Sequence, residues 1–432
     1  MSEQNENPPV EQRDPAYFQY YGMLTHQQNM LQDVVRTSTY RNAILNNGAL
    51  FKDRLVLDVG AGSGILSYFA AQAGAKVYAV EASGMAEKMQ KVVNEANKKD
   101  GTGKNAWMKD RIQVVQDKIE SPNLPVPQVD TLISEPIGVL LVHERMLESF
   151  VYARDKYLKP GGAILPSQGS IELAPFTDFA LWTETMGKVR FWQHSNFYGV
   201  DLRPLQEDAR EEMFGMPVVG HFDPKSLMAL PTPGGFNVDF YTITLPQLRD
   251  FTIPIYWQIK YTGIMHGVAG WFDLSFIPPV GTLNPVNIDM STGPAAERTH
   301  WQQVRFLFKE PLAVNSNQVV KGWMRCVVNE MRSYFVDAEI AVCDENFNVT
   351  PETIESLPIS SRRKGRWNLH EQTYNYNYVP EYAGNQDLFR PENNFLYEPE
   401  NEFVKLDMDQ ISEDMMTMVE SVAEAVALPN FN

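Results

Sequence analysis

The sequence predicts an α/β fold in which a parallel sheet with crossover helices is followed by a second, largely antiparallel domain. From Tyr17 to about residue 165, apolar strand-like runs such as RLVLDVG and KVYAVEA alternate with helix-like stretches such as MAEKMQKVVNEANKK. Strands and helices in alternation are typical of a parallel sheet. After the turn YLKPGGAILPSQG, short apolar runs are separated by Gly, Pro and Asn, which indicates an antiparallel sandwich or barrel.

The 432 residues are enough for two or three domains, and we predict four segments. Residues 1–16 form a polar leader that we expect to be disordered. The parallel-sheet domain follows at 17–165, the antiparallel domain at 166–345, and an acidic, Asn-, Tyr- and Pro-rich extension at 346–432. Within the antiparallel domain, the aromatic stretch 179–215 predicts a helical insertion. It is either an exposed dimerisation arm or an insertion packed on its own barrel.

The extension ends in a strongly acidic region. Between Glu392 and Glu424 there are ten acidic residues and one lysine, interleaved with apolar residues at steps of three and four. This spacing predicts an amphipathic helix, which either forms on a partner, such as a transcription protein, or packs on the barrel.

Composition excludes several classes of protein. Hydrophobic residues make up 44% and charged residues 21%, as in an ordinary globular protein. A formal net charge of −17 argues against direct binding of nucleic acid through phosphates and favours basic partners, although solubility alone also explains such a charge.

The cysteines and the apolar runs predict a soluble intracellular protein. Cys326 and Cys343 are too few for a disulfide framework and lack the spacing of metal ligands, so we expect no metal site. The polar N-terminus has no basic-then-apolar signal, and no run of about 18 apolar residues predicts a membrane span.

A glycine-rich loop, VLDVGAGSGIL at 56–66, joins a predicted strand to a predicted helix. Gly60, Gly62 and Gly64 permit a tight turn and the close approach of a ligand at the end of a parallel strand. A dinucleotide site usually reads G-x-G-x-x-G, but residue 65 is isoleucine here, and Asp58 precedes the first glycine.

An acid at this point repels a pyrophosphate but suits a ligand that carries an amino group and a sulfonium. Glu81 ends the next predicted strand, VYAVEAS, where it can accept hydrogen bonds from both ribose hydroxyls of an adenosine. The pattern therefore favours S-adenosyl-L-methionine over a dinucleotide as the cofactor.

Two glutamates bracket an apolar run in SEPIGVLLVHERMLES at 134–149. Taken alone, Glu135 and Glu144 are explained as the water-facing ends of a buried strand or turn. With a methyl donor nearby, the stretch resembles the double-glutamate loop of the protein arginine methyltransferases.

Three further blocks support the resemblance in the family's order: YFQYYGMLTHQQNMLQDVVRT, VLDVGAGSGILSYFAAQAGA and the triplet THW at 299–301. The similarity covers about residues 17–345 and is closest to the coactivator-associated, type I branch. That branch has an additional N-terminal domain, which we expect to be missing here because the cofactor motifs begin almost at once. It implies a Rossmann-like methyl-donor domain, a β-barrel with a helical dimerisation arm near 191–202, and a head-to-tail homodimer.

The resemblance also assigns roles to individual residues. Cofactor-binding roles pass to Phe18, Tyr21, Met30, Arg36, Asp58, Gly60, Gly62, Gly64, Glu81 and Glu120. Glu135 and Glu144 are expected to hold the substrate guanidinium, and His300 with Asp33 to form a contact between barrel and donor domain that is either structural or takes a proton. Substrate-binding roles pass to Tyr17, Tyr21, Met146 and Trp301.

The chain departs from the branch at four positions. Ile137 and Val139 replace methionine and tyrosine, Ala61 replaces cysteine, and His26 replaces glutamine. The hydroxyl missing at Val139 affects the expected substrate preference more than the expected chemistry.

Transfer of methyl groups to arginines of histones or RNA-binding proteins, giving asymmetric dimethylarginine, is therefore the predicted activity, in the nucleus and cytoplasm. Two alternatives remain: a methyltransferase for another substrate class, and an inactive methyltransferase fold that acts as an interaction scaffold. The basic run SRRKGR at 361–366 is a nuclear address, a self-methylation site or a solvated linker.

Overall fold

The computed structural model describes residues 14–98, 105–232 and 235–376. Most of the predicted leader and the predicted acidic helix lie outside these residues. In the described part of the chain, no helix is both long enough and apolar enough to cross a membrane.

Three helices precede the first sheet, α1 (Asp14–Tyr21), α2 (Leu24–Gln32) and α3 (Val34–Leu45). Asp33 lies between α2 and α3, and its carboxylate caps α3 by accepting a hydrogen bond from the backbone N–H of Arg36 at 2.9 Å. The short 3-10 helix η2 (Gly48–Leu50) then leads into the sheet.

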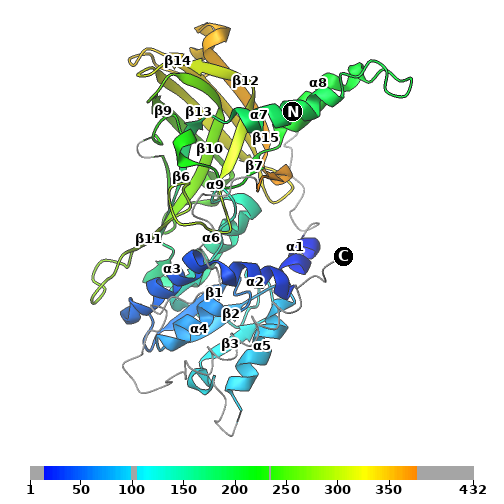
Figure 1. Ribbon diagram of the computed structural model, residues 1–432. Coiled ribbons are helices and arrows are strands. Elements are labelled where there is room, and N and C mark those ends of the chain that lie inside the picture. The colour runs from blue at the N-terminus through cyan, green and yellow to red at the C-terminus, as the bar shows by residue number, and fades with distance from the viewer. Residues whose placement is uncertain (1–13, 99–104, 233–234, 377–432) are drawn as a thin grey trace, which may run out of the picture. The chain divides into compact units, whose positions relative to one another are not determined.

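The first sheet is parallel and has the order β3-β2-β1-β4-β5. Its strands are β1 (Leu55–Val59), β2 (Lys76–Val80), β3 (Ile112–Val115), β4 (Val129–Ser134) and β5 (Leu158–Leu165). The helices of this domain are α4 (Ile65–Gln72), α5 (Met85–Ala96), η3 (Ala106–Met108), η4 (His143–Arg145) and α6 (Met146–Tyr157). Figure 1 shows α4 and α5 beside the sheet.

This arrangement places three sequence motifs together. The glycine loop follows β1, Glu81 follows β2 and Glu135 follows β4, and these three strands are neighbours in the sheet. Parallel neighbours end at the same edge of a sheet, so the three motifs meet there. The Ser134 hydroxyl donates to the carbonyl of Val59 at 2.7 Å and ties β4 to the end of β1.

The second domain consists of two sheets, antiparallel except for the parallel pair β7–β16, that form a barrel-like structure, as predicted. One sheet contains β6 (Gln168–Phe176), β7 (Val218–Val219), β8 (Phe236–Asp239), β10 (Gly263–Phe276), β11 (Ile288–Ser291), β12 (Val304–Val314) and β16 (Thr373–Tyr374). The other contains β9 (Asp250–Gln258), β13 (Val319–Val328), β14 (Tyr334–Cys343) and β15 (Arg362–Asn368). Short helices at η6 (Pro224–Ser226), α9 (Leu245–Arg249), η7 (Ile354–Ser356), η8 (Ile359–Ser361) and η9 (Leu369–Glu371) connect the strands.

Two buried tryptophans join the sheets across the barrel core. Trp257 on β9 donates from Nε1 to the carbonyl of Leu173 on β6 at 3.0 Å. Trp367 on β15 donates in the same way to Leu307 on β12 at 3.2 Å. Each indole therefore satisfies its buried N–H while filling the core.

The insertion contains α7 (Phe179–Phe191), η5 (Arg203–Leu205) and α8 (Gln206–Gly215). Figure 1 shows α7 and α8 beside the barrel and the connecting loop running out from it. Leu181, Val189 and Phe214 pack against barrel residues, whereas Tyr198 in the loop is 95% exposed. The base of the insertion is thus packed on the barrel, and its tip is exposed.

The basic run SRRKGR belongs to a strand and its approach. β15 pairs antiparallel with β14, so the second sheet continues past residue 346, where the sequence predicted the extension to begin. Arg362 forms an ion pair with Glu355, and Arg363 donates to the carbonyls of Glu310 and Pro311. The sequence did not predict this strand, because a strand is recognised by alternating apolar residues and this segment consists mainly of basic ones.

Candidate functional site

A cavity of about 560 Å³ lies at the carboxyl edge of the parallel sheet. The N-terminal helices, the glycine loop, the double-glutamate loop, the THW triplet and residues of the barrel end contribute to its wall. All predicted site residues line it except Asp33, Asp58 and Gly64. The cavity therefore brings together residues from segments far apart in the chain.

The glycine loop packs closely against neighbouring side chains and adopts backbone angles that suit glycine. Gly60 and Gly62 adopt φ angles of +68° and +54°. Residues other than glycine adopt this backbone region only at a cost in free energy. A Cβ at Gly60 would lie 2.1 Å from Cε of Met146, and one at Gly62 would lie 2.8 Å from Oε1 of Gln27. The positive φ angles and the clashes of a Cβ atom thus both require glycine at these two positions.

Glu81 is held in place by the backbone beside the glycine loop. Its carboxylate accepts from the N–H of Gly62 at 2.8 Å and from the N–H of Ser83 at 2.7 Å. Since a carboxylate has about four acceptor positions, Glu81 keeps acceptor capacity toward the cavity.

Asp58 lies beneath the loop rather than in the cavity wall. It is completely buried and accepts a hydrogen bond from the Ser67 hydroxyl at 2.6 Å. Burial raises the pKa of Asp58 to about 7, with a further contribution from the Glu81 charge, although the Ser67 hydrogen bond opposes the shift. Asp58 therefore contacts α4, and its position indicates support of the loop.

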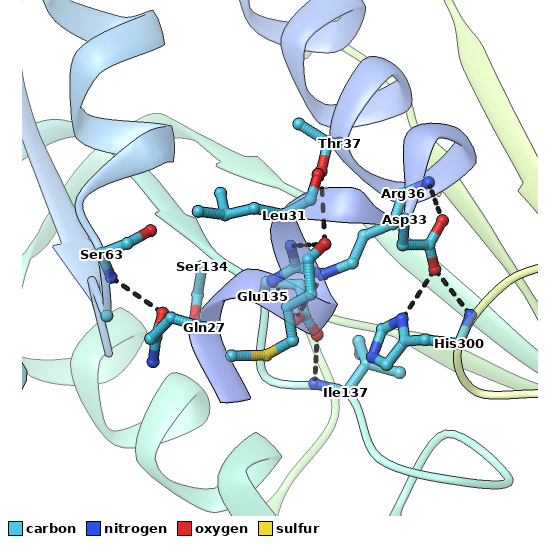
Figure 2. Close-up of polar contacts among 12 residues, drawn as sticks. Gln27, Leu31, Asp33, Arg36, Thr37, Ser63, Ser134, Glu135, Ile137 and His300 are labelled. Atoms are coloured by element: carbon cyan, nitrogen blue, oxygen red, sulfur yellow. Dashed lines mark hydrogen bonds and ion pairs between the residues drawn. The ribbon is translucent and has the colours of Figure 1, made fainter. Parts of the chain in front are cut away.

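Glu135 is paired with Arg36 (Figure 2). Nε and Nη2 of Arg36 donate to Oε2 of Glu135 at 2.9 and 2.5 Å, while the N–H of Ile137 donates to Oε1 at 3.1 Å. Burial opposes the charge of Arg36, but the Glu135 carboxylate outweighs this effect and the pKa of Arg36 is raised. Nη1 of Arg36 also donates to the carbonyl of Met30 at 3.2 Å.

Glu144 is held by two tyrosines from α1. The Tyr21 hydroxyl lies 2.8 and 2.7 Å from its two carboxylate oxygens, and the Tyr17 hydroxyl lies 3.1 Å from Oε2. Burial raises the pKa of Glu144, the tyrosine hydrogen bonds lower it, and the nearby Glu135 charge raises it again, with a net increase. The two glutamates thus line one cavity and lie near enough for the charge of Glu135 to raise the pKa of Glu144.

The backbone that presents Glu144 is strained. Leu140, Leu141, Glu144 and Arg145 all have positive φ angles, between 55° and 72°. Such conformations cost about 1–3 kcal/mol each and persist where surrounding contacts enforce them. Here Arg145 is buried, donating to the carbonyl of Asn329 at 3.0 Å and pairing with Glu148 at 2.6 Å.

His143 also fastens the loop to the barrel. Its Nδ1 lies 2.8 Å from the Ser333 hydroxyl in the β13–β14 turn, and its Nε2 lies 3.3 Å from the Gln372 amide. Burial, followed by the charge of His370, lowers the pKa of His143 to about 4. A neutral imidazole therefore stands next to Glu144 at neutral pH.

His300 and Asp33 form the contact that the resemblance implied between barrel and donor domain. Oδ2 of Asp33 accepts from Nδ1 and from the backbone N–H of His300, each at 2.7 Å (Figure 2). Burial raises the pKa of Asp33, but the hydrogen bonds from His300 and Arg36 outweigh it and the pKa is lowered. Trp301 is buried and donates to the carbonyl of Ile137 at 2.9 Å, which anchors the double-glutamate loop.

Phe18 and Glu120, two further predicted residues, lie at the cavity margin. Lys118 lies over the ring of Phe18, with 5.6 Å between its Nζ and the ring centroid. Oε1 of Glu120 accepts from the Ser149 hydroxyl at 2.5 Å.

Sequence reasoning missed several residues of the wall. Gln27 is buried and joins the glycine loop to α1, accepting from the N–H of Ser63 at 3.0 Å and donating to the carbonyl of Tyr21 at 3.1 Å. Gln372, Tyr374 and Tyr376 also line the cavity, because β16 pairs with β7 beside it. The Tyr-rich run after the barrel was a compositional signal, but its placement depends on this pairing.

Two family models match successive parts of the chain. The methyltransferase domain matches residues 57–165, and the arginine methyltransferase oligomerization subdomain matches residues 172–342. These segments correspond to the parallel sheet and to most of the barrel with its insertion.

Curated relatives cover a similar range. A probable histone-arginine methyltransferase CARM1 of Oryza sativa subsp. indica is 45% identical over 321 residues, which are 74% of this chain and 58% of that protein. The histone-arginine methyltransferase CARMER of Drosophila yakuba is 44% identical over 327 residues, 76% of this chain and 58% of that protein. The matched region thus spans under two thirds of these relatives' length.

Solved structures show the same architecture. Protein arginine methyltransferase 10 of Arabidopsis thaliana, in an open conformation, has a TM-score of 0.69 at 27% identity, covering 82% of this chain and all of that one. The Trypanosoma brucei PRMT1 enzyme–prozyme heterotetrameric complex with AdoHcy gives a TM-score of 0.64 at 26% identity, covering 81% of this chain and 99% of that one. With the two matched domains in order and the double-glutamate cavity between them, the chain belongs to the protein arginine methyltransferase family.

Proposed function

We propose that the protein transfers methyl groups from S-adenosyl-L-methionine to guanidinium nitrogens of arginine in proteins. The observation that carries the proposal is the pair Glu135 and Glu144, which line one cavity beside the glycine loop and Glu81. The proposed cofactor-binding part is residues 17–165, and the proposed substrate part begins at 166.

The residues present fit this cofactor. Any side chain at Gly60 or Gly62 would collide with Met146 or Gln27, so the backbone of the loop stays bare at these positions. Glu81 has acceptor capacity for ribose hydroxyls, and Arg36, which Glu135 pairs in this structure, is a buried cation that can also bind a carboxylate. The proposed adenosine neighbours are Phe18, Met30 and Glu120 at the cavity wall. When bound, the cofactor supplies an electrophilic methyl group on a sulfonium. Asp58 and Gly64 would act by shaping the loop.

The same cavity suits a guanidinium. Arginine stays protonated at physiological pH and presents five donors in a planar fork, which carboxylates accept in pairs. The buried carboxylates of Glu135 and Glu144 would hold this fork and draw its positive charge away from the nitrogen that attacks. Met146, Tyr17, Tyr21 and Trp301 would restrict the side chain's position, and orientation of this kind can supply several kcal/mol.

A proton leaves the guanidinium as the new bond forms. Glu144 is one acceptor, because burial raises its pKa and so makes it a better base. His300, oriented by Asp33, is the other. We propose Glu144 as the first acceptor, since its carboxylate holds the substrate directly.

Further parts of the proposal concern product and partners. We propose the asymmetric, type I product, with basic proteins such as histones or RNA-binding proteins as substrates, to which a net charge of −17 is complementary. The exposed tip of the α7–α8 insertion would dock on a second copy in a head-to-tail homodimer. We propose the nucleus and the cytoplasm as its location, because substrates of these kinds occur there.

The test is Glu135→Gln, which keeps the size of the side chain and removes its charge. We expect titration calorimetry to show S-adenosyl-L-methionine uptake close to that of the unmodified protein, and we expect methylation of an arginine peptide to be abolished. Mass spectrometry of the unmodified protein's product, read by neutral loss, distinguishes asymmetric from symmetric dimethylarginine. Retained turnover by Glu135→Gln would refute the proposed mechanism, and lack of cofactor uptake by the unmodified protein would favour an interaction scaffold.

A further inference from the structure

Arg332 places a positive charge in the wall of a cavity that is proposed to receive a positively charged side chain. It lies on the turn between β13 and β14 and lines the cavity. Its guanidinium carbon lies 4.3 Å from the centroid of the Tyr17 ring, a stacking distance for a cation on an aromatic face. Tyr17 is one of the two tyrosines bonded to Glu144.

The turn holds Arg332 in a defined position. Arg332 has a φ of +55°, and the buried side chain of Asn329 accepts from the backbone N–H groups of Met331 and Ser333 at 2.9 and 3.0 Å. The carbonyl of Asn329 accepts a hydrogen bond from Nη1 of Arg145, in the double-glutamate loop, at 3.0 Å. The turn is therefore fixed to the loop that carries Glu144.

The charge of Arg332 reaches the proposed substrate clamp. Burial and Glu144 raise the pKa of Tyr17, and Arg332 opposes both. Arg332 likewise opposes the rise in the pKa of Glu144 that burial and Glu135 produce. A charge that acts on both groups also acts on whatever residue of a substrate lies next to the clamped arginine.

We propose that Arg332 determines specificity by selecting against a lysine or arginine beside the target arginine and in favour of an uncharged or acidic neighbour. The inference rests on the proposed function and refines its substrate class. The overall negative charge attracts basic proteins over long distances, whereas Arg332 acts locally, beside the Tyr17 ring whose hydroxyl is bonded to Glu144. Suitable sites would thus be arginines in basic proteins whose immediate neighbours are not cationic.

The experiment compares peptides that differ at one residue. Lys, Gln or Glu is placed in turn at each of the two positions on either side of the arginine, and kcat/KM is measured with the full chain. At the position nearest Arg332 we expect the Glu peptide to exceed the Lys peptide by about tenfold, because exposed charge pairs are weak and replacing Lys by Glu exchanges one repulsion for one attraction. Arg332→Gln should bring the ratio of kcat/KM for the Glu and Lys peptides to about one, and Arg332→Glu should make the Lys peptide the better substrate.

Two further variants separate charge from shape. Arg332→Lys keeps the charge without the planar stacking group and should retain the preference. Arg325→Glu is the matched charge reversal, because Arg325 lies on β13, pairs with Asp250 at 2.6 Å and is outside the cavity wall; it should leave the ratio unchanged. Thermal unfolding and cofactor titration verify that each variant is folded.

The outcomes are distinct. If the unmodified protein methylates the peptides and the Glu-to-Lys ratio is the same in Arg332→Glu, the inference is wrong while the proposed function stands. A uniform loss of rate across all peptides would likewise overturn it, since that result assigns Arg332 to support of Tyr17. If the unmodified protein methylates none of the peptides, the proposed function fails and the inference with it.

Discussion

Replacing Tyr21 by phenylalanine tests whether Glu144 acts as a charged group. The change removes the hydroxyl that lies 2.7 and 2.8 Å from the carboxylate oxygens and leaves the ring in place. A hydrogen bond to a charged group contributes about 1.5–3 kcal/mol, and each ~1.4 kcal/mol in the barrier is a factor of ten in rate. Tyr17 still donates to Oε2 at 3.1 Å, so we expect kcat/KM to fall roughly 10- to 100-fold rather than to zero.

The pH profile gives the decisive measurement. The Tyr21 hydrogen bond favours the charged form of Glu144 and lowers its pKa against the effect of burial. Its loss should raise the pKa further, so less of Glu144 is ionised at a given pH. We therefore expect the acid limb of kcat/KM for an arginine peptide to move to higher pH.

The control for this experiment is Tyr20→Phe, which removes a neighbouring hydroxyl. Tyr20 is half exposed and stacks on His26, with 3.6 Å between the ring centroids. This variant should leave the acid limb where it is in the unmodified protein. If Tyr21→Phe lowers the rate equally at every pH, its hydroxyl positions the substrate without affecting Glu144, and the reasoning above is wrong.

Three other predictions follow from buried groups. Burial raises the pKa of Asp58 to about 7, so this group's contribution to stability is fully present below its unfolded pKa and is lost as the pH rises to about 7. The Tm of Asp58→Asn relative to the unmodified protein should therefore increase between about pH 4 and pH 7 and level off above that; a constant difference would contradict this. Gln27→Ala removes the acceptor for the N–H of Ser63 and should weaken cofactor binding, measured by calorimetry, about tenfold. The control, Gln28→Ala on the exposed side of α2, should leave the affinity unchanged. Equal affinities for the two variants would show that the glycine loop keeps its conformation without Gln27. Trp367→Ala should lower the free energy of unfolding by about 3–5 kcal/mol in urea titration, because it empties a buried core position, and a loss below 1 kcal/mol would mean that β15 contributes little to the barrel.

The cofactor side of the cavity was predictable from the sequence for a physical reason. Neighbouring parallel strands end at one edge, so the glycine loop, Glu81 and Glu135 had to lie close together once the strand order was known. The resemblance added Tyr17, Tyr21 and the contact between His300 and Asp33, which the alternation of apolar and polar residues does not reveal.

Tertiary pairing explains what the sequence did not show. Arg36 meets Glu135 across 99 positions of sequence, a contact that no local pattern specifies. Arg332 reaches the cavity because of a turn, and Gln372 reaches it because β16 pairs with a two-residue strand. β15 was missed because its strand pattern is basic rather than apolar.

The pairing of β15 and β16 has a consequence for biosynthesis. The matched barrel segment ends at residue 342, but Trp367 still has to enter the core and Tyr374 the cavity wall. A nascent chain that has emerged from the ribosome as far as Cys343 therefore has its glycine loop and both glutamates but an unfinished barrel. Its exposed β14 edge is open to pairing with other chains until β15 arrives.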